Sequence, residues 1–146
     1  MSEPGAKLRD MTTLLPAPAR PSSVLGLAAI CVDCADPPAL AAFYAALLGA
    51  PVEVSDDGDA GLYDLDGPNI DFLRVPEAKA GKNRLHLDLR AADITEAVAL
   101  ALSLGATLAL DVYDGEEWVV LRDPEGNEFC LLRPQAGGVV RYHPGS

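Results

Sequence analysis

The stretch DPEGNEFCLLRP, residues 123–134, combines a tight turn with a strand, and a second copy of this pattern occurs earlier in the chain. Pro and Gly in DPEGN favour a turn, and the alternation of side chains in NEFCLLR is typical of a strand. The earlier copy is DGPNIDFLRV, residues 66–75. In both copies a turn glycine, Gly67 or Gly126, precedes an arginine by seven residues. The two stretches therefore occupy equivalent places in two related halves of the chain.

The likeness between the two halves continues upstream. Asp36 and Asp93 each precede a helical pattern, and Ala29 and His86 stand seven residues before them. This spacing indicates an internal repeat of about 57 residues. Since neither half can bury its sheet alone, we predict one domain of the α+β class, built from two βαβββ modules. The repeat makes three pairs of positions equivalent: Ala29 with His86, Asn69 with Glu128, and Asp71 with Cys130.

Each half contains one predicted helix with clear signals at its ends. Asp36 and Asp93 are the predicted N-caps, and Gly49 and Gly105 are the predicted ends. Two prolines follow Asp36, where a missing N–H does no harm, and Glu96 forms a capping box with Asp93. The predicted strands are residues 24–35, 51–55, 61–66 and 69–75 in the first half, and residues 84–90, 107–113, 117–122 and 127–133 in the second.

The predicted domain spans residues 24–134, with modules at 24–75 and 84–134. The leader, residues 1–23, is rich in Pro, Ala and Ser and is predicted to be disordered. The leader has no apolar run long enough for a signal peptide, and no segment approaches the length of a membrane span. Residues 135–146 form a C-terminal tail.

The charge of the chain argues against some classes of partner. Its formal net charge is -11, and its 11 Lys and Arg residues form no cluster of the kind that neutralises phosphates. We therefore predict neither a nucleic-acid partner nor an anionic membrane partner. Three cysteines, an odd number, fit a reducing cytoplasm better than a disulfide framework.

Three predicted strands each carry a mixed polar face. Because successive side chains of a strand alternate between its faces, His86 and Asp88 share one face while the neighbouring leucines, Leu85 among them, pack on helices. In the same way Glu128 and Cys130 share one face of the last strand, and Asp71 lies on the polar face of the strand at 69–75. Single residues of this kind are often only exposed positions of a half-solvated sheet. The equivalent repeat positions, however, predict that His86, Asp71, Glu128 and Cys130 approach one another around a ligand.

The two βαβββ modules, the LHLDL strand at 85–89 and the closing WVVLRDPEGNEFCL at 118–131 resemble the vicinal oxygen chelate superfamily. The likeness is greatest to its glyoxalase-like domains, which are related to glyoxalase I, bleomycin-resistance proteins and extradiol dioxygenases. The resemblance covers about residues 24–134 and implies a cupped mixed sheet that holds a small molecule. It also implies a homodimer whose interface often completes the ligand cleft.

The resemblance also identifies the positions at which relatives bind a divalent metal. These positions are Ala29, Asp71, His86 and Cys130 in this sequence. His86 matches the usual histidine, whereas Ala29 offers no ligand atom and Cys130 replaces the usual closing glutamate. His86, Asp71 and Cys130 are therefore weak candidates for a metal such as Zn²⁺, with Glu128 as a substitute. The incomplete set favours a lost metal site.

Three functions stay open at this stage. A lyase or isomerase would use His86 with Asp88 or another carboxylate to move a proton next to a carbonyl. A sequestering protein of the bleomycin-resistance type would hold its ligand against Trp118, helped by Tyr63, Tyr113 and Tyr44. A ligand sensor would need neither catalysis nor metal. In each case the predicted ligand-binding residues are Asp71, Trp118, Glu128 and Cys130.

Overall fold

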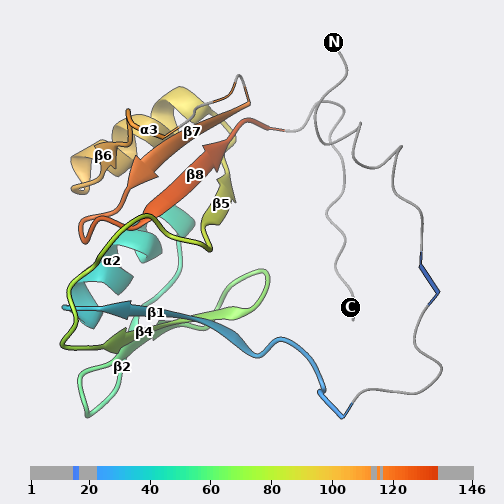
Figure 1. Cartoon of the computed structure of the whole chain (residues 1–146), viewed down its shortest axis with the longest axis vertical. Helices are drawn as coiled ribbons and strands as arrows, with labels where there is room; N and C mark the ends of the chain where they lie inside the picture. Colours follow the sequence, from blue (N-terminus) through green and yellow to red (C-terminus); the bar gives the residue numbers. More distant parts are fainter. Residues whose placement is uncertain (1–14, 17–22, 113–114, 116, 135–146) are drawn as a thin grey trace.

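The computed structural model describes residues 15–16, 23–112, 115 and 117–134. The predicted leader and tail lie largely outside these residues, as does Tyr113. Two modules follow one another along the chain, each with a helix on one face of a four-stranded sheet (Figure 1). The predicted α+β class with paired βαβββ modules is therefore confirmed. Neither helix in the described residues is long and apolar enough to cross a membrane.

The two modules have the same strand order. The first contains β1 (Ala29–Cys34), α2 (Pro37–Leu48), β2 (Glu53–Val54), β3 (Ala60–Leu62) and β4 (Asn69–Arg74), in the sheet order β1-β4-β3-β2. The second contains β5 (Leu87–Arg90), α3 (Ile94–Ser103), β6 (Thr107–Leu108), β7 (Trp118–Arg122) and β8 (Glu128–Leu132), in the sheet order β5-β8-β7-β6.

Strand pairing follows the predicted repeat. In each module the first strand runs parallel to the last, and the other pairs are antiparallel. Cys31 lies opposite Asp71 in the first sheet, and Asp88 lies opposite Cys130 in the second. Cys31 and Asp88 are separated by the repeat length, so the two ladders have equivalent registers.

Both helices begin as their caps predict. The Asp36 side chain accepts a hydrogen bond from the Ala39 N–H, and the Asp93 side chain accepts one from the Glu96 N–H. These bonds satisfy N–H groups that the first turn leaves without a helical partner. Helix α2 ends at Gly49, whose φ of 67° is left-handed, a conformation that glycine adopts without a side-chain clash.

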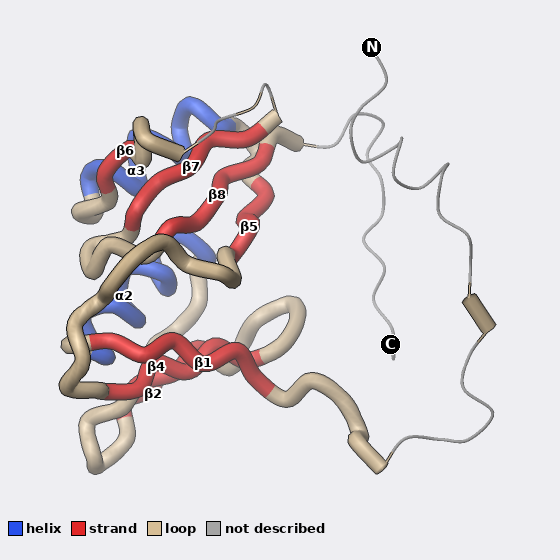
Figure 2. Tube along the Cα trace, viewed as in Figure 1, coloured by secondary structure: helices blue, strands red, loops and turns tan. Residues whose placement is uncertain are grey.

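Helix α2 lies between the two sheets (Figure 2). The Phe43 ring is 5.7 Å from the Phe129 ring of β8, and the Tyr44 ring is 5.8 Å from both Phe129 and Phe72 of β4. Apolar side chains of both modules therefore form one continuous core around this helix. Among the described strands, β1 and β5 each pair on one side only and leave their other edges open.

The DPEGN turn docks the second module on the first. The Glu125 carboxylate accepts hydrogen bonds from the Ala35 N–H at 2.6 Å and the Asp36 N–H at 3.0 Å, at the start of α2. The buried Tyr44 hydroxyl donates to Asp123 at 2.7 Å. Asp123 also accepts from the Asn127 side chain and backbone, which fixes the turn itself. We refer to the contacts made by Glu125 and Asp123 with the first module as the turn latch.

Two predicted strands start later than expected. Strand β1 begins at Ala29, opposite Asn69, and Leu25 before it is exposed, because the partner strand β4 begins only after Pro68. Strand β5 begins at Leu87, so the prediction that Leu85 packs on a helix was wrong. Leu85 is 86% exposed, and only Leu87 and Leu89 of this stretch contact the core.

The latch predicts a measurable pH effect. Burial, and then the Asp123 carboxylate, raise the pKa of Tyr44 far above its usual range. When folding raises the pKa of a tyrosine, the protonated hydroxyl stabilises the folded state. This stabilisation is fully present below the pKa of the unfolded chain, about 10, and it is lost as the pH rises above that value. Tyr44→Phe should lower the free energy of unfolding in urea by about 1 kcal/mol at pH 7 and make its decline above pH 10 shallower.

Tyr63→Phe is the matched control, because Tyr63 is exposed on the other side of the first sheet. Its hydroxyl bonds to Asp71 at the exposed surface, so Tyr63→Phe should change the free energy of unfolding at pH 7, and its decline above pH 10, less than Tyr44→Phe does. Equal alkaline slopes for Tyr44→Phe and the wild type would contradict the proposed role of the latch tyrosine.

Candidate functional site

The outer face of the second sheet carries a cavity of about 340 Å³, within the range of pockets that hold small organic molecules. This face points away from α3, because Leu121 and Phe129 point toward the helices and their neighbours point outward. We call this cavity the second-sheet pocket. Its lining comprises Lys82, His86, Asp88, Val112, Trp118, Val120, Glu128, Cys130 and Leu132.

Neighbouring strands supply the apolar part of this pocket. Trp118 and Val120 are two residues apart on β7 and lie opposite Leu132 and Cys130 of β8. The indole ring lies over Gly115, where an added Cβ would be 2.3 Å from a ring carbon. A side chain at position 115 would therefore displace the ring. Glycine at this position allows Trp118 to lie beside the sheet.

A histidine and a carboxylate stand at the rim of the pocket. His86 Nδ1 and Asp88 Oδ1 are 3.0 Å apart, and both side chains are about half exposed. The carboxylate can hold Nδ1 in its protonated form, which leaves Nε2 to accept a proton or bind a ligand. Asp88 lies directly opposite Cys130 in the ladder, so the thiol belongs to the same group.

Glu128 has a different environment from these three residues. It is 4% exposed, and its carboxylate lies 3.4 Å from the Asn83 N–H, 3.7 Å from Lys79 Nζ and 3.9 Å from Arg122 Nε. The two cations offset the cost of burying its charge. Glu128 thus ties the linker between the modules to the wall of the pocket.

Asp71 lies apart from this group. Asp71 is on β4 of the first sheet, where its carboxylate accepts a hydrogen bond from the Tyr63 hydroxyl. This hydrogen bond raises the pKa of Tyr63. The Tyr63 ring in turn covers Gly61, the residue opposite Asp71 in the ladder. The described part of the structure therefore brings His86, Asp88, Trp118, Glu128 and Cys130 to one pocket, and it leaves Asp71 on the other sheet.

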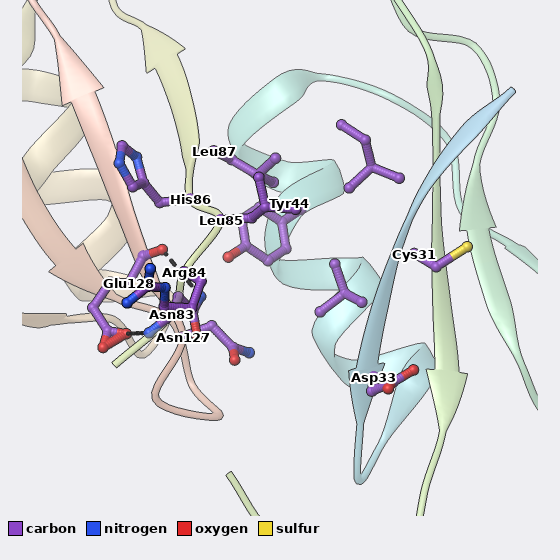
Figure 3. Close-up of a pocket in the computed structure, with 12 residues that line it drawn as sticks. Cys31, Asp33, Tyr44, Asn83, Arg84, Leu85, His86, Leu87, Asn127 and Glu128 are labelled. Atoms are coloured by element: carbon purple, nitrogen blue, oxygen red, sulfur yellow. Dashed lines mark hydrogen bonds between the residues drawn. The ribbon is translucent and has the colours of Figure 1, made fainter. Parts of the chain in front are cut away.

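A second cavity, of about 250 Å³, lies between the open edges of β1 and β5 (Figure 3). Tyr44 and Cys31 line it on the side of the first module, and Arg84 and Leu85 line it on the side of the second. His86 borders both cavities. Figure 3 shows the side chains of His86 and Leu87 leaving the chain on opposite sides, with Leu87 toward α2.

Sequence reasoning missed several lining residues. Val120 could have been found, because it is two residues from Trp118 on the same strand face. Gly115 and Lys82 gave no periodic signal, since both lie outside regular elements. Of the aromatic residues expected around one pocket, Trp118 lines the second-sheet pocket, Tyr44 lines the cavity between the edges, and Tyr63 lies on the first sheet.

The architecture is that of a paired βαβββ domain with its candidate site on an open sheet face. The family model described as "Glyoxalase-like domain" matches residues 29–132, and the chain belongs to this family. The predicted membership of the vicinal oxygen chelate superfamily is thereby confirmed. No curated protein sequence matches the chain.

Solved structures share the fold at low sequence identity. A glyoxalase/bleomycin resistance protein/dioxygenase family enzyme from Burkholderia phytofirmans PsJN is 22% identical, with a TM-score of 0.61 over 73% of this chain and 96% of that one. A mutant fosfomycin resistance protein FosX from Listeria monocytogenes, complexed with Mn(II) and 1S,2S-dihydroxypropylphosphonic acid, is 15% identical, with a TM-score of 0.63 over 79% and 94%. TioX from Micromonospora sp. ML1 is 16% identical, with a TM-score of 0.51 over 74% and 98%.

The metal positions that the family resemblance implies do not fit a metal within this chain. Ala29 has no ligand atom, and Asp71 lies on a different sheet from His86 and Cys130. Among the described residues, His86, Asp88 and Cys130 are the group whose possible ligand atoms lie within 4.8 Å of one another. The carboxylate of this group is therefore Asp88 and not Asp71.

Proposed function

We propose that this protein binds a small organic molecule, with an apolar or aromatic body and one polar end, in the second-sheet pocket. The observation that best supports this is Trp118 beside Val120 and Leu132, with His86 and Asp88 at the rim of the same cavity. Aromatic and aliphatic side chains favour burial of an apolar body, and a few polar groups orient it.

A sequestering role needs affinity and no reactive group. The family's implied metal set is incomplete here, since Ala29 offers no ligand atom and Asp71 lies on the first sheet. We therefore place binding or sensing of the bleomycin-resistance type ahead of metal-dependent turnover.

Proton transfer is the second candidate function, and the His86–Asp88 pair favours it. A carboxylate on Nδ1 orients the imidazole, so Nε2 can remove a proton next to a carbonyl of a bound ligand. This is the chemistry of a lyase or an isomerase. The apolar pocket floor would reduce competition from water.

We also propose a homodimer in the cytoplasm. The open edges of β1 and β5 can each pair with a strand of another chain, and Leu85 beside β5 is an exposed apolar side chain. The described cysteines form no disulfide with one another, in keeping with a reducing compartment.

The binding proposal is tested by a ligand screen on the intact chain. Quenching of Trp118 fluorescence identifies ligands, and calorimetry then compares variants. We expect Trp118→Ala to weaken binding about 10- to 100-fold, and Trp118→Phe to recover most of the affinity. Gly115→Ala should weaken binding similarly, because its Cβ displaces the indole. Undiminished affinity in both Trp118→Ala and Gly115→Ala would place the ligand elsewhere.

The catalytic proposal is tested by isotope exchange. Carbonyl compounds that bind are incubated with the protein in D₂O, and deuterium uptake next to the carbonyl is followed by NMR. His86→Gln should slow the exchange about 10²- to 10⁴-fold while affinity changes only a few-fold. Asp56→Asn, in an exposed loop, serves as the control. If deuterium uptake is equal with and without protein, the catalytic proposal is contradicted and binding remains the proposed function.

The dimer proposal is tested by sedimentation velocity. The wild type should sediment as a dimer, and Leu85→Asp should shift it to a monomer, since a charge would be buried at the new interface. Leu110→Asp is the matched control: Leu110 is 83% exposed and follows β6, at the opposite edge of the sheet from β5. A wild type that remains monomeric at high concentration would contradict this proposal.

A further inference from the structure

The linker between the two modules supplies a cation to the second-sheet pocket. Among the described residues that line this pocket, Lys82 is the one whose side chain carries a permanent positive charge. Its ammonium group donates to the Asn83 carbonyl at 3.2 Å, and it forms no ion pair with a carboxylate in the described part of the chain. Since an ammonium group has three donors, Lys82 can also contact a ligand.

Glu128 holds the linker on both sides of Lys82. On one side, Lys79 Nζ lies 3.7 Å from the Glu128 carboxylate. On the other side, the Asn83 N–H donates to that carboxylate and the Asn83 side chain donates to the Glu128 carbonyl, both at 3.4 Å (Figure 3). Between these contacts Gly81 has a φ of 73°, a left-handed conformation that suits glycine in a turn. Glu128 itself is buried on β8, so the linker is tied to a fixed point of the sheet.

The charges close to Lys82 are nearly balanced, although the whole chain is acidic. Lys79 and Arg122 lie 3.7 Å and 3.9 Å from the Glu128 carboxylate and offset its charge. Asp88 is about half exposed, so water screens its charge. A ligand with one negative charge would contact Lys82 directly, whereas the carboxylates of the pocket are already paired or solvated. Such a ligand therefore meets net attraction at the rim.

We propose that Lys82 recognises the polar end of the ligand, that this end is a monoanion such as a carboxylate, and that Glu128 positions Lys82 for the contact. Lys82 has this role only if the ligand binds in the second-sheet pocket, as proposed above. The ligand class is then a small aromatic or aliphatic acid whose apolar body lies against Trp118 and Val120.

The test compares two probes of equal size, 2-naphthoate and the neutral 2-naphthamide, by calorimetry on the intact chain. The wild type should bind 2-naphthoate about 5-fold more tightly or better, and Lys82→Met should remove most of this preference while 2-naphthamide binds within about two-fold of the wild type. Arg84→Gln is the matched control, because it removes a neighbouring positive charge that lines the other cavity. Arg84→Gln should keep the preference for the anion.

The role of Glu128 is tested by the sign of an effect. Glu128→Gln removes a negative charge from the pocket wall, so direct electrostatics alone would raise the preference for 2-naphthoate. Release of Lys82 should instead lower the preference to about that of Lys82→Met, and the double variant should show no further loss. Glu53→Gln, at an exposed position of β2, should match the wild type.

Asn83→Ala gives a second test of the positioning role without any change of charge. It removes the side-chain bond to the Glu128 carbonyl, and we expect it to lower the preference for 2-naphthoate about two-fold. This variant keeps the test decisive if circular dichroism shows that Glu128→Gln folds poorly.

Three outcomes would overturn this assignment and leave the binding function intact. They are equal affinity of the wild type for both probes, an unchanged preference in Lys82→Met, or a preference in Glu128→Gln and Asn83→Ala that is not lowered. Failure of the binding function has a different signature. Absence of binding by either probe, or affinities that Trp118→Ala leaves unchanged, would contradict the second-sheet pocket as the site and the role of Lys82 with it.

Discussion

The turn latch between Glu125 and the start of α2 is the contact on which the arrangement of the two modules depends. One carboxylate accepts both the Ala35 and Asp36 N–H groups, where the positive end of the helix dipole also favours a negative charge. The Tyr44–Asp123 bond lies beside it in the core, so breaking it leaves the buried Tyr44 hydroxyl without this partner. Because the latch holds α2 between the sheets, the outer face of each sheet remains open.

This role explains why the chain can contain a DPEGN turn although the metal positions implied by the family resemblance do not fit a metal. Asp123 and Asn127 serve the turn and the latch, whereas Cys130 lies on the outer face and contributes to the pocket. Replacing a metal ligand on the outer face leaves the latch untouched. Fold and chemistry therefore depend on different faces of the same strand, and membership of the family by itself says little about the reaction.

The sequence could predict what depends on local pattern. The repeat led to the equivalent ladders, and the caps at Asp36 and Asp93 led to both helices. It could not predict that the two sheets are separate within one chain, because this follows from contacts distant in sequence, such as those of Tyr44 with Phe72 and Phe129. For the same reason Asp71 was expected beside His86. The alternation of residues around Asp71 predicted which face of its strand the side chain is on. The direction in which that face points depends on how the modules pack.

The charges around the second-sheet pocket influence which ligands it favours. The chain has a net charge of -11, and Asp88 and Glu128 add negative charge at the pocket, while Lys82 supplies a cation at its rim. Like charges repel, so this pocket disfavours a ligand with several anionic groups, and it favours one with a single polar end that Lys82 can contact. An electrostatic pocket of this kind does not need the usual family ligand set, because the second sheet alone supplies both the charge and the apolar surface.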